Sequence, residues 1–230
     1  MSIYRGITTF MAAFAMSGMA CAQTAMSIDQ ILAIARERYV KIETHTMTTI
    51  ASDGARTYQK TANAQATGFR IGGKYVITDF HVMTAGDRCT IDGKPVTYVK
   101  IAPDLDLALF TMNFPNELPW IRIADANIGH TVYVFSNADG QDGFFMRFFV
   151  SKLDGQFLYL QERTVGGTSG SGYLDEWGNL VGLAMQDMFS DNGGTHSHFL
   201  YAEGIPASVL RAFLRGIVPE DAERSADAPR

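Results

Sequence analysis

The stretch GGTSGSGYLDEWGNLVGLAM, residues 166–185, joins a glycine-rich opening directly to an apolar run. Strand-like segments flank the opening: QFLYLQE (156–162) precedes it and NLVGLAM (179–185) follows it. Composition alone leaves two interpretations, a flexible surface loop or a tight turn whose glycines adopt positive φ angles. Main-chain N–H groups that converge in such a turn can stabilise an oxyanion. The rest of the chain has to decide between the two.

Outward from this stretch, from about 44 to 202, the chain is a series of short β-type runs. The runs are rich in β-branched and aromatic residues. Besides the two segments that flank the glycine-rich opening, they are KYVITDF (74–80), TYVKIA (97–102), LALFTM (107–112), TVYVFS (131–136) and FFMRFFVSKL (144–153). Dipeptides suited to tight hairpins lie between runs: Asp92-Gly93, Asp139-Gly140, Asp154-Gly155 and Trp177-Gly178. Many short strands at this spacing predict an all-β sandwich or barrel.

A helix is predicted at each end of the β region. Ser27 and Gln30 form a capping box before a helical repeat of apolar residues, which predicts a helix over 28–40. Near the C-terminus, Pro206 lies in the first turn of a second helix and Gly216 ends it. Its apolar face consists of Val209, Leu210, Phe213 and Leu214.

Two further stretches carry residues suited to catalysis. YVITDFHVM places His81 just after an apolar run, where a strand would deliver it to a loop. PDLDLALF places Asp106 immediately before an apolar strand, where a carboxylate is costly unless it is paired, and a histidine N–H is an obvious partner. Asp104 is the rival acid, one step from the strand after Pro103. Histidine, aspartate and serine in this order match the chymotrypsin arrangement of a catalytic triad.

Together the three blocks resemble the signature blocks of trypsin-like serine peptidases. The blocks are ATGFRIGGKYVITDFHVM (66–83), DLDLALF (104–110) and the opening stretch, and the bacterial Deg/HtrA-type and glutamyl-endopeptidase branches are the most similar. HFLYAEGIPASVLRAFL (198–214) also resembles the last strand and helix of that branch. The resemblance implies an all-β fold of two antiparallel six-stranded barrels, with an N-terminal and a C-terminal helix. No segment of the size of a PDZ domain follows, so a form without that domain is expected.

The resemblance also assigns roles to the site residues. A glycine two positions before the nucleophile turns its N–H toward the oxyanion, and Gly167 has this position relative to Ser169, whereas Ser171 has a serine there. Ser169 is therefore expected to be the nucleophile, His81 the general base and Asp106 the residue that orients the histidine. The N–H groups of Gly167 and Ser169 would form the oxyanion hole. Neither a metal nor an organic cofactor is expected.

Two positions are candidates for substrate binding. The glutamyl branch has a threonine five residues before the nucleophile, and Thr164 matches it. The branch also has a histidine on the following strand that reads an acidic side chain, and Ala184 occupies that place here. Specificity for glutamate is therefore not predicted.

Two departures leave an alternative to an active endopeptidase. Phe80 before the histidine and Gly172 after the nucleophile are unusual for the family. The alternative is a catalytically degenerate protein that binds or inhibits through the same fold. The presence of all three triad residue types favours the endopeptidase.

Composition limits the partners. The chain has 230 residues, of which 47% are hydrophobic and 19% charged, and its net charge is −5, so nothing favours nucleic acid or an anionic membrane as a partner. A protein or peptide substrate is the expected partner. His196 and His198 make a zinc site conceivable, but no further ligand pattern accompanies them, and loop histidines are favoured.

The N-terminus has the pattern of a cleaved export signal. Arg5 precedes the apolar run ITTFMAAFAMSGMA, and Ala20-Cys21-Ala22 is a signal-peptidase site. A lipoprotein acylated at Cys21 is the alternative, but Gly18 stands where a leucine is usual. Cleavage after Ala22 gives a periplasmic or secreted protein.

The expected organisation is a signal peptide over 1–22, a peptidase domain over 23–218 and a polar tail over 219–230. Cleavage would leave Cys89 as the single cysteine of the mature chain, with no internal disulfide. Cys89 is expected to be a half-buried thiol rather than a nucleophile, because no basic residues mark it as activated.

Overall fold

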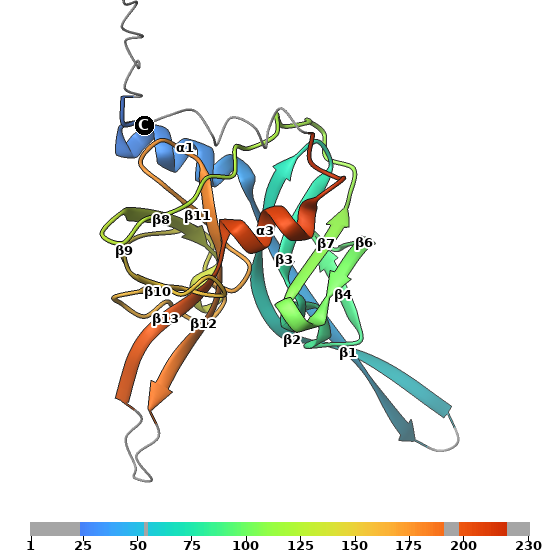
Figure 1. Cartoon of the computed structure of the whole chain (residues 1–230). Helices are drawn as coiled ribbons and strands as arrows, with labels where there is room; N and C mark the ends of the chain where they lie inside the picture. The colour runs from blue at the N-terminus through green and yellow to red at the C-terminus, as the bar shows by residue number, and fades with distance from the viewer. Residues whose placement is uncertain (1–23, 53–54, 191–197, 220–230) are drawn as a thin grey trace, which may run out of the picture.

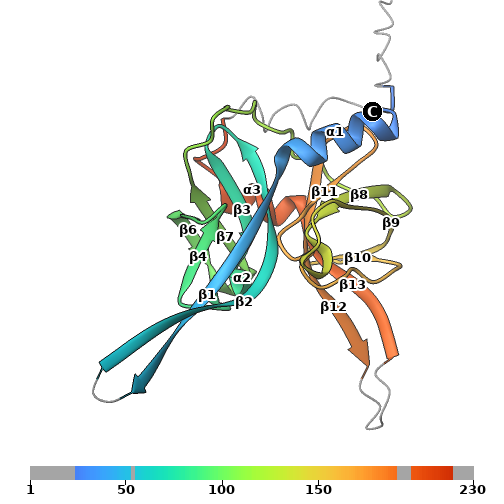
Figure 2. The same ribbon diagram turned by 180° about the vertical axis from the view of Figure 1, so that it is seen from behind.

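The computed structural model describes residues 24–52, 55–190 and 198–219, with the main chain alone for 46–52, 55–64, 187–190 and 198–200. Two β lobes lie side by side (Figure 1). Helix α1 (Ile28–Arg38) lies across one end of the C-terminal lobe, and helix α3 (Ala207–Leu214) lies where the lobes meet (Figures 1 and 2). The prediction of a two-lobed, chymotrypsin-like β fold is confirmed.

The N-terminal lobe is a seven-stranded antiparallel sheet with the strand order β5-β4-β1-β2-β3-β7-β6. The strands are β1 (Tyr39–Ser52), β2 (Ala55–Gly72), β3 (Tyr75–Asp79), β4 (Arg88–Ile91), β5 (Lys94–Pro95), β6 (Thr97–Ala102) and β7 (Leu107–Thr111). The expected closed six-stranded barrel is not found here. Within the described residues the sheet keeps two unpaired edges, and at one edge Pro95 lacks the N–H that would extend the hydrogen bonding.

The C-terminal lobe is the closed six-stranded barrel that was predicted, with the order β10-β13-β12-β11-β8-β9. Its strands are β8 (Thr131–Ser136), β9 (Phe144–Leu153), β10 (Leu158–Leu160), β11 (Gly172–Leu174), β12 (Leu180–Ser190) and β13 (His198–Pro206). Strands β11 and β12 come from the glycine-rich stretch and its apolar continuation, so this stretch is built into the barrel wall. His196 lies outside the described residues, as does the side chain of His198.

Both predicted helices form, with shifted ends. The N–H of Gln30 donates to Oγ of Ser27 (3.3 Å) and the N–H of Ser27 donates to Oε1 of Gln30 (2.9 Å), which completes the capping box of α1. The helix ends at Arg38 rather than at residue 40 because Tyr39 begins β1, where its ring packs edge-on against Phe135. Pro206 is the N-cap of α3, one position before the helix.

The described residues form three apolar clusters, and one of them joins the two lobes. One lies within the C-terminal barrel around Leu158, and one lies within the N-terminal sheet around Phe110. The third joins residues of α1, α3 and both sheets, including Ile31, Phe69 and Leu210. The two lobes therefore share a core, which fixes the position of one lobe relative to the other.

The described residues contain no helix long and apolar enough to cross a bilayer. Cys89 is a free thiol, and it is buried rather than half-buried; burial raises its pKa to about 12. Since the thiolate is the nucleophilic form, this pKa agrees with an unreactive cysteine.

Candidate active site

His81 and Asp106 lie at the ends of neighbouring strands. Strand β3 pairs with β7, and His81 follows β3 in the short helix α2 (Phe80–Thr84). Asp106 directly precedes β7, after the 3-10 turn η1 (Pro103–Leu105). Its backbone is left-handed, with φ of 52°, a conformation that aspartate tolerates better than most residues.

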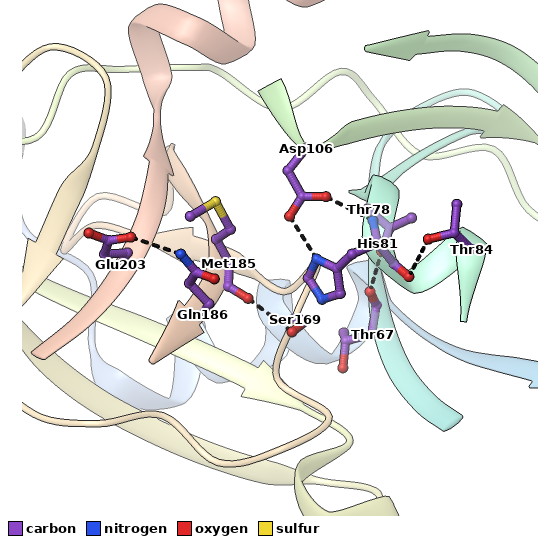
Figure 3. A network of polar contacts seen from close by, with 9 residues as sticks. All are labelled: Thr67, Thr78, His81, Thr84, Asp106, Ser169, Met185, Gln186 and Glu203. Atoms are coloured by element: carbon purple, nitrogen blue, oxygen red, sulfur yellow. Dashed lines mark hydrogen bonds and ion pairs between the residues drawn. The ribbon is translucent and has the colours of Figure 1, made fainter. Parts of the chain in front are cut away.

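Asp106 binds His81 through both carboxylate oxygens. Oδ2 of Asp106 lies 2.7 Å from Nδ1 of His81, and Oδ1 accepts the main-chain N–H of His81 at 2.8 Å. The main-chain carbonyl of Asp106 also accepts the N–H of Phe80 (3.0 Å). The two bonds between Asp106 and His81, drawn in Figure 3, fix the orientation of the imidazole. Asp104 is exposed, and the ion pair of His81 is formed with Asp106.

The glycine-rich stretch is a tight turn packed against both lobes. Gly167 has φ of 90°, and a Cβ there would lie 2.2 Å from the Asn137 carbonyl oxygen. Gly170 has φ of 82°, and its Cβ would lie 2.1 Å from the Thr67 carbonyl oxygen. Side chains are excluded at both positions by space and by backbone conformation. The interpretation as a flexible loop is therefore wrong.

Ser169 and His81 line the same pocket. It has a volume of about 100 Å³, and Gly167 is also among its lining residues. The hydroxyl of Ser169 donates to the main-chain carbonyl of Met185 (3.0 Å), as drawn in Figure 3, and not to His81. The three residues predicted to form the triad are thus brought together, with the serine side chain turned toward β12. Ser171 is fully buried, and its Oγ has no hydrogen-bond partner among the described residues.

The main-chain N–H groups of Gly167 and Ser169 donate no hydrogen bond to the described part of the chain. Their neighbours are bonded: the N–H of Thr168 donates to the Val165 carbonyl (3.0 Å) and that of Gly170 to the Ala184 carbonyl (2.9 Å). Two unused donors beside a serine on a pocket are the arrangement that an oxyanion hole needs.

The two candidates for substrate binding are both buried. Thr164 lies in the loop before the turn. The side chain of Ala184 packs in the core of the C-terminal barrel, and its N–H and carbonyl bond to Ser171 and Gly170. Ala184 therefore supports the turn through its main chain, and a direct contact of its methyl group with substrate stays a prediction.

Sequence reasoning missed two residues of the site. Thr67 on β2 donates its hydroxyl to the Gly167 carbonyl (2.9 Å), and no local pattern marks it. Asp79, two residues before His81, is fully buried at the end of β3. Asp106 was predicted from the cost of an unpaired carboxylate at the mouth of a buried apolar strand. The same cost at the other end of a strand, in YVITDF, would have identified Asp79 too.

One group of side chains in the site could hold a metal ion. Among the described residues, Asp79, His81 and Asp106 each offer a ligand atom, and these atoms lie within 4.8 Å of one another. Nδ1 of His81 and Oδ2 of Asp106 are already bonded to each other, so an ion between them would have to replace that bond.

Comparison with solved structures finds the same fold in HtrA-type proteases. The protease AlgW with a decapeptide is 18% identical over 82% of this chain and 66% of that chain, with a TM-score of 0.62. A variant of AlgW with a tripeptide is 17% identical over 85% of this chain and 65% of that one, with a TM-score of 0.65. The chain thus spans about two thirds of the length of these proteins.

Comparison by sequence gives the family. No curated protein matches the chain. The model of the trypsin-like peptidase domain matches residues 66–183, which include His81, Asp106 and the turn around Ser169. This match covers more than half of the chain. The chain belongs to the family of trypsin-like peptidase domains, and by that membership it is a protease of the serine endopeptidase class.

Proposed function

We propose that the protein is an exported endopeptidase that cleaves peptide bonds through a triad of Ser169, His81 and Asp106 and an acyl-enzyme intermediate. The observation that carries the proposal is the Asp106–His81 pair, joined by two hydrogen bonds, together with the pocket that His81 lines with Ser169 and Gly167. The N–H of Gly167 donates no hydrogen bond within the described residues.

In the first half-reaction, Oγ of Ser169 attacks the carbonyl carbon of the substrate while Nε2 of His81 takes its proton. The hydroxyl must first leave the Met185 carbonyl and turn toward His81. The oxyanion that forms accepts hydrogen bonds from the N–H groups of Gly167 and Ser169. His81 then protonates the leaving amine, and the acyl group stays on Ser169.

In the second half-reaction a water molecule replaces the amine. His81 removes its proton, the hydroxide attacks the acyl carbon, and the proton returns to Ser169. Asp106 accepts a hydrogen bond from the Nδ1–H of His81 throughout, which stabilises the imidazolium formed in each half. None of these steps calls for a metal or a cofactor.

A peptide substrate is proposed because two of the structural neighbours are HtrA-type proteases described with a decapeptide and a tripeptide. Export is proposed from the signal pattern over 1–22, residues that lie outside the described part of the chain. Intact mass of the exported protein tests the second point: a chain that begins at Gln23 is expected, and a diacylglyceryl group on Cys21 would contradict it.

The test of the chemistry is covalent labelling by a fluorophosphonate probe. Wild-type protein should be labelled at Ser169, as located by peptide mass spectrometry, and Ser169→Ala should not be labelled. The degenerate binding protein remains the second candidate, because the Ser169 hydroxyl is bonded away from His81. Wild-type protein that is folded, unlabelled and inactive on casein would favour that candidate.

A further inference from the structure

Asp79 is a buried carboxyl group that the triad mechanism does not use. It ends β3 and is the N-cap of α2, but its side chain makes no capping bond. It has 0% exposure, and neither carboxylate oxygen has a hydrogen-bond partner within the described residues. A buried carboxylate without partners is among the most costly groups in a protein, so this one needs an explanation.

The groups that face Asp79 are few. Polar side-chain atoms of His81 from α2, of Asp106 from the start of β7 and of Asp79 itself lie within 4.8 Å of one another. Leu107, the partner of Asp79 in the β3–β7 pairing, is apolar. From the nucleophile turn comes the N–H of Gly170, whose hydrogen bond goes to Ala184. Asp106 and His81 are thus the titratable groups that the described structure places against Asp79.

Two carboxyl groups this close share one proton more easily than they carry two negative charges. Asp106 accepts two hydrogen bonds from His81 and is partly exposed, so its charge is well supported. Asp79 is fully buried and, within the described residues, has no hydrogen bond comparable with those of Asp106. Burial, and next the charge of Asp106, raise the pKa of Asp79 well above its usual range, while the Gly170 N–H opposes this rise.

We propose that Asp79 is a positioning residue for the His81–Asp106 pair: as a neutral carboxyl it leaves Asp106 as the single negative charge beside the imidazole, and a second negative charge at Asp79 would disrupt the pair. This role rests on the proposed function for its effect on turnover. Its effect on the Asp106–His81 bond and on stability is independent of any activity.

The stability arm of the test compares unfolding midpoints of wild type and Asp79→Asn from pH 4 to pH 9. An unfolded aspartate loses its proton near pH 4, while the folded one keeps it. Wild type therefore loses stability as the pH rises from about 4 toward the folded pKa, and the amide, which has no proton to lose, does not. The midpoint of Asp79→Asn should exceed that of wild type by a margin that grows with pH to on the order of 5 °C. Asp104→Asn, an exposed carboxylate two residues from Asp106, is the matched control and should show no such trend.

The positioning arm follows the NMR signal of the Nδ1 proton of His81, which reports its bond to Asp106 whether or not the protein cleaves peptides. As the pH rises, the signal should disappear in wild type at a lower pH than in Asp79→Asn. In turnover, Asp79→Ala should lower kcat/KM about 10-fold or more, since small misplacements of catalytic groups are costly. Asp79→Asn should restore most of that loss and move the alkaline decline of kcat/KM to higher pH.

The three kinds of result test three separate claims: the neutral state of Asp79, its positioning role and the proposed function. Stability curves of wild type and Asp79→Asn that run parallel over the pH range would show that Asp79 is not held neutral. Identical Nδ1 signals, or equal kcat/KM profiles for Asp79→Ala, Asp79→Asn and wild type, would overturn the positioning role. A wild-type protein without peptidase activity would overturn the proposed function, while the stability and NMR arms would still decide the state of Asp79.

Discussion

Thr67 and Ser169 join the two lobes at the proposed nucleophile. The main-chain N–H of Thr67, on β2 of the N-terminal sheet, donates to the main-chain carbonyl of Ser169 across 3.0 Å. The Thr67 hydroxyl donates to the Gly167 carbonyl (2.9 Å) and accepts the N–H of Asn137 (3.0 Å). The turn is thus held on one side by the N-terminal sheet and on the other by β12, so its geometry depends on the association of both lobes.

Thr67→Val removes the hydroxyl and keeps the shape of the side chain. It leaves the Gly167 carbonyl and the Asn137 N–H without this partner, and the free energy of unfolding should fall by about 1–3 kcal/mol. Because Gly167 then loses an anchor, kcat should also fall, by about 10-fold or more. Thr67→Ser keeps the hydroxyl and is the control, to be compared by urea unfolding and peptide hydrolysis. Equal losses in the two variants would contradict the role of the hydroxyl.

Ser169→Ala and Ser171→Ala should differ sharply although they are two residues apart. The first removes the attacking oxygen, so hydrolysis of casein or a peptide library should fall by several powers of ten while circular dichroism shows an intact fold. The second removes a buried hydroxyl that has no hydrogen-bond partner among the described residues, so activity and stability should be largely retained. Full activity in Ser169→Ala would refute the assignment of the nucleophile.

Asp106→Asn should keep the fold, because asparagine also tolerates the left-handed backbone of this position. The amide cannot hold the imidazole in the tautomer that accepts the serine proton, so turnover should fall by about 10⁴-fold. Asp104→Asn, in the exposed turn before it, should change turnover little. If Asp104→Asn lost more turnover than Asp106→Asn, the assignment of Asp106 as the residue that orients His81 would be wrong.

Gly167→Val should impair both stability and rate. A side chain at φ of 90° costs on the order of 1–3 kcal/mol in backbone strain, and here it also meets the Asn137 carbonyl. Loss of one oxyanion donor lowers kcat by about 10²–10³-fold. Gly155→Val is a control for strain alone, because this glycine has φ of 88° in a hairpin with nothing within 4 Å of its Cβ position. Similar turnover in the two variants would argue against an oxyanion donor at Gly167.

The sequence by itself determined the features that depend on neighbours in the chain. Alternating and apolar runs predicted β3, β7 and β12, and the capping box of Ser27 and Gln30 predicted the start of α1. Both kinds of pattern can be read from the sequence because strand pleating and helix capping involve residues only a few positions apart. Three short blocks that contain His81, Asp106 and Ser169 in this order predicted the catalytic triad. Their resemblance to one family also gave the glycine two residues before the nucleophile.

Only the tertiary structure decided what depends on contacts across the chain. The side-chain hydroxyl of Thr67 reaches a turn 100 residues further on, and nothing near Thr67 in the sequence indicates that partner. The open seven-stranded sheet follows from long-range pairing that local patterns do not specify. The state of Asp79 depends on its complete burial beside Asp106, and burial is a property of the packed lobes. Hydrogen bonds and charges act over ångströms of space, while sequence patterns report only distances along the chain.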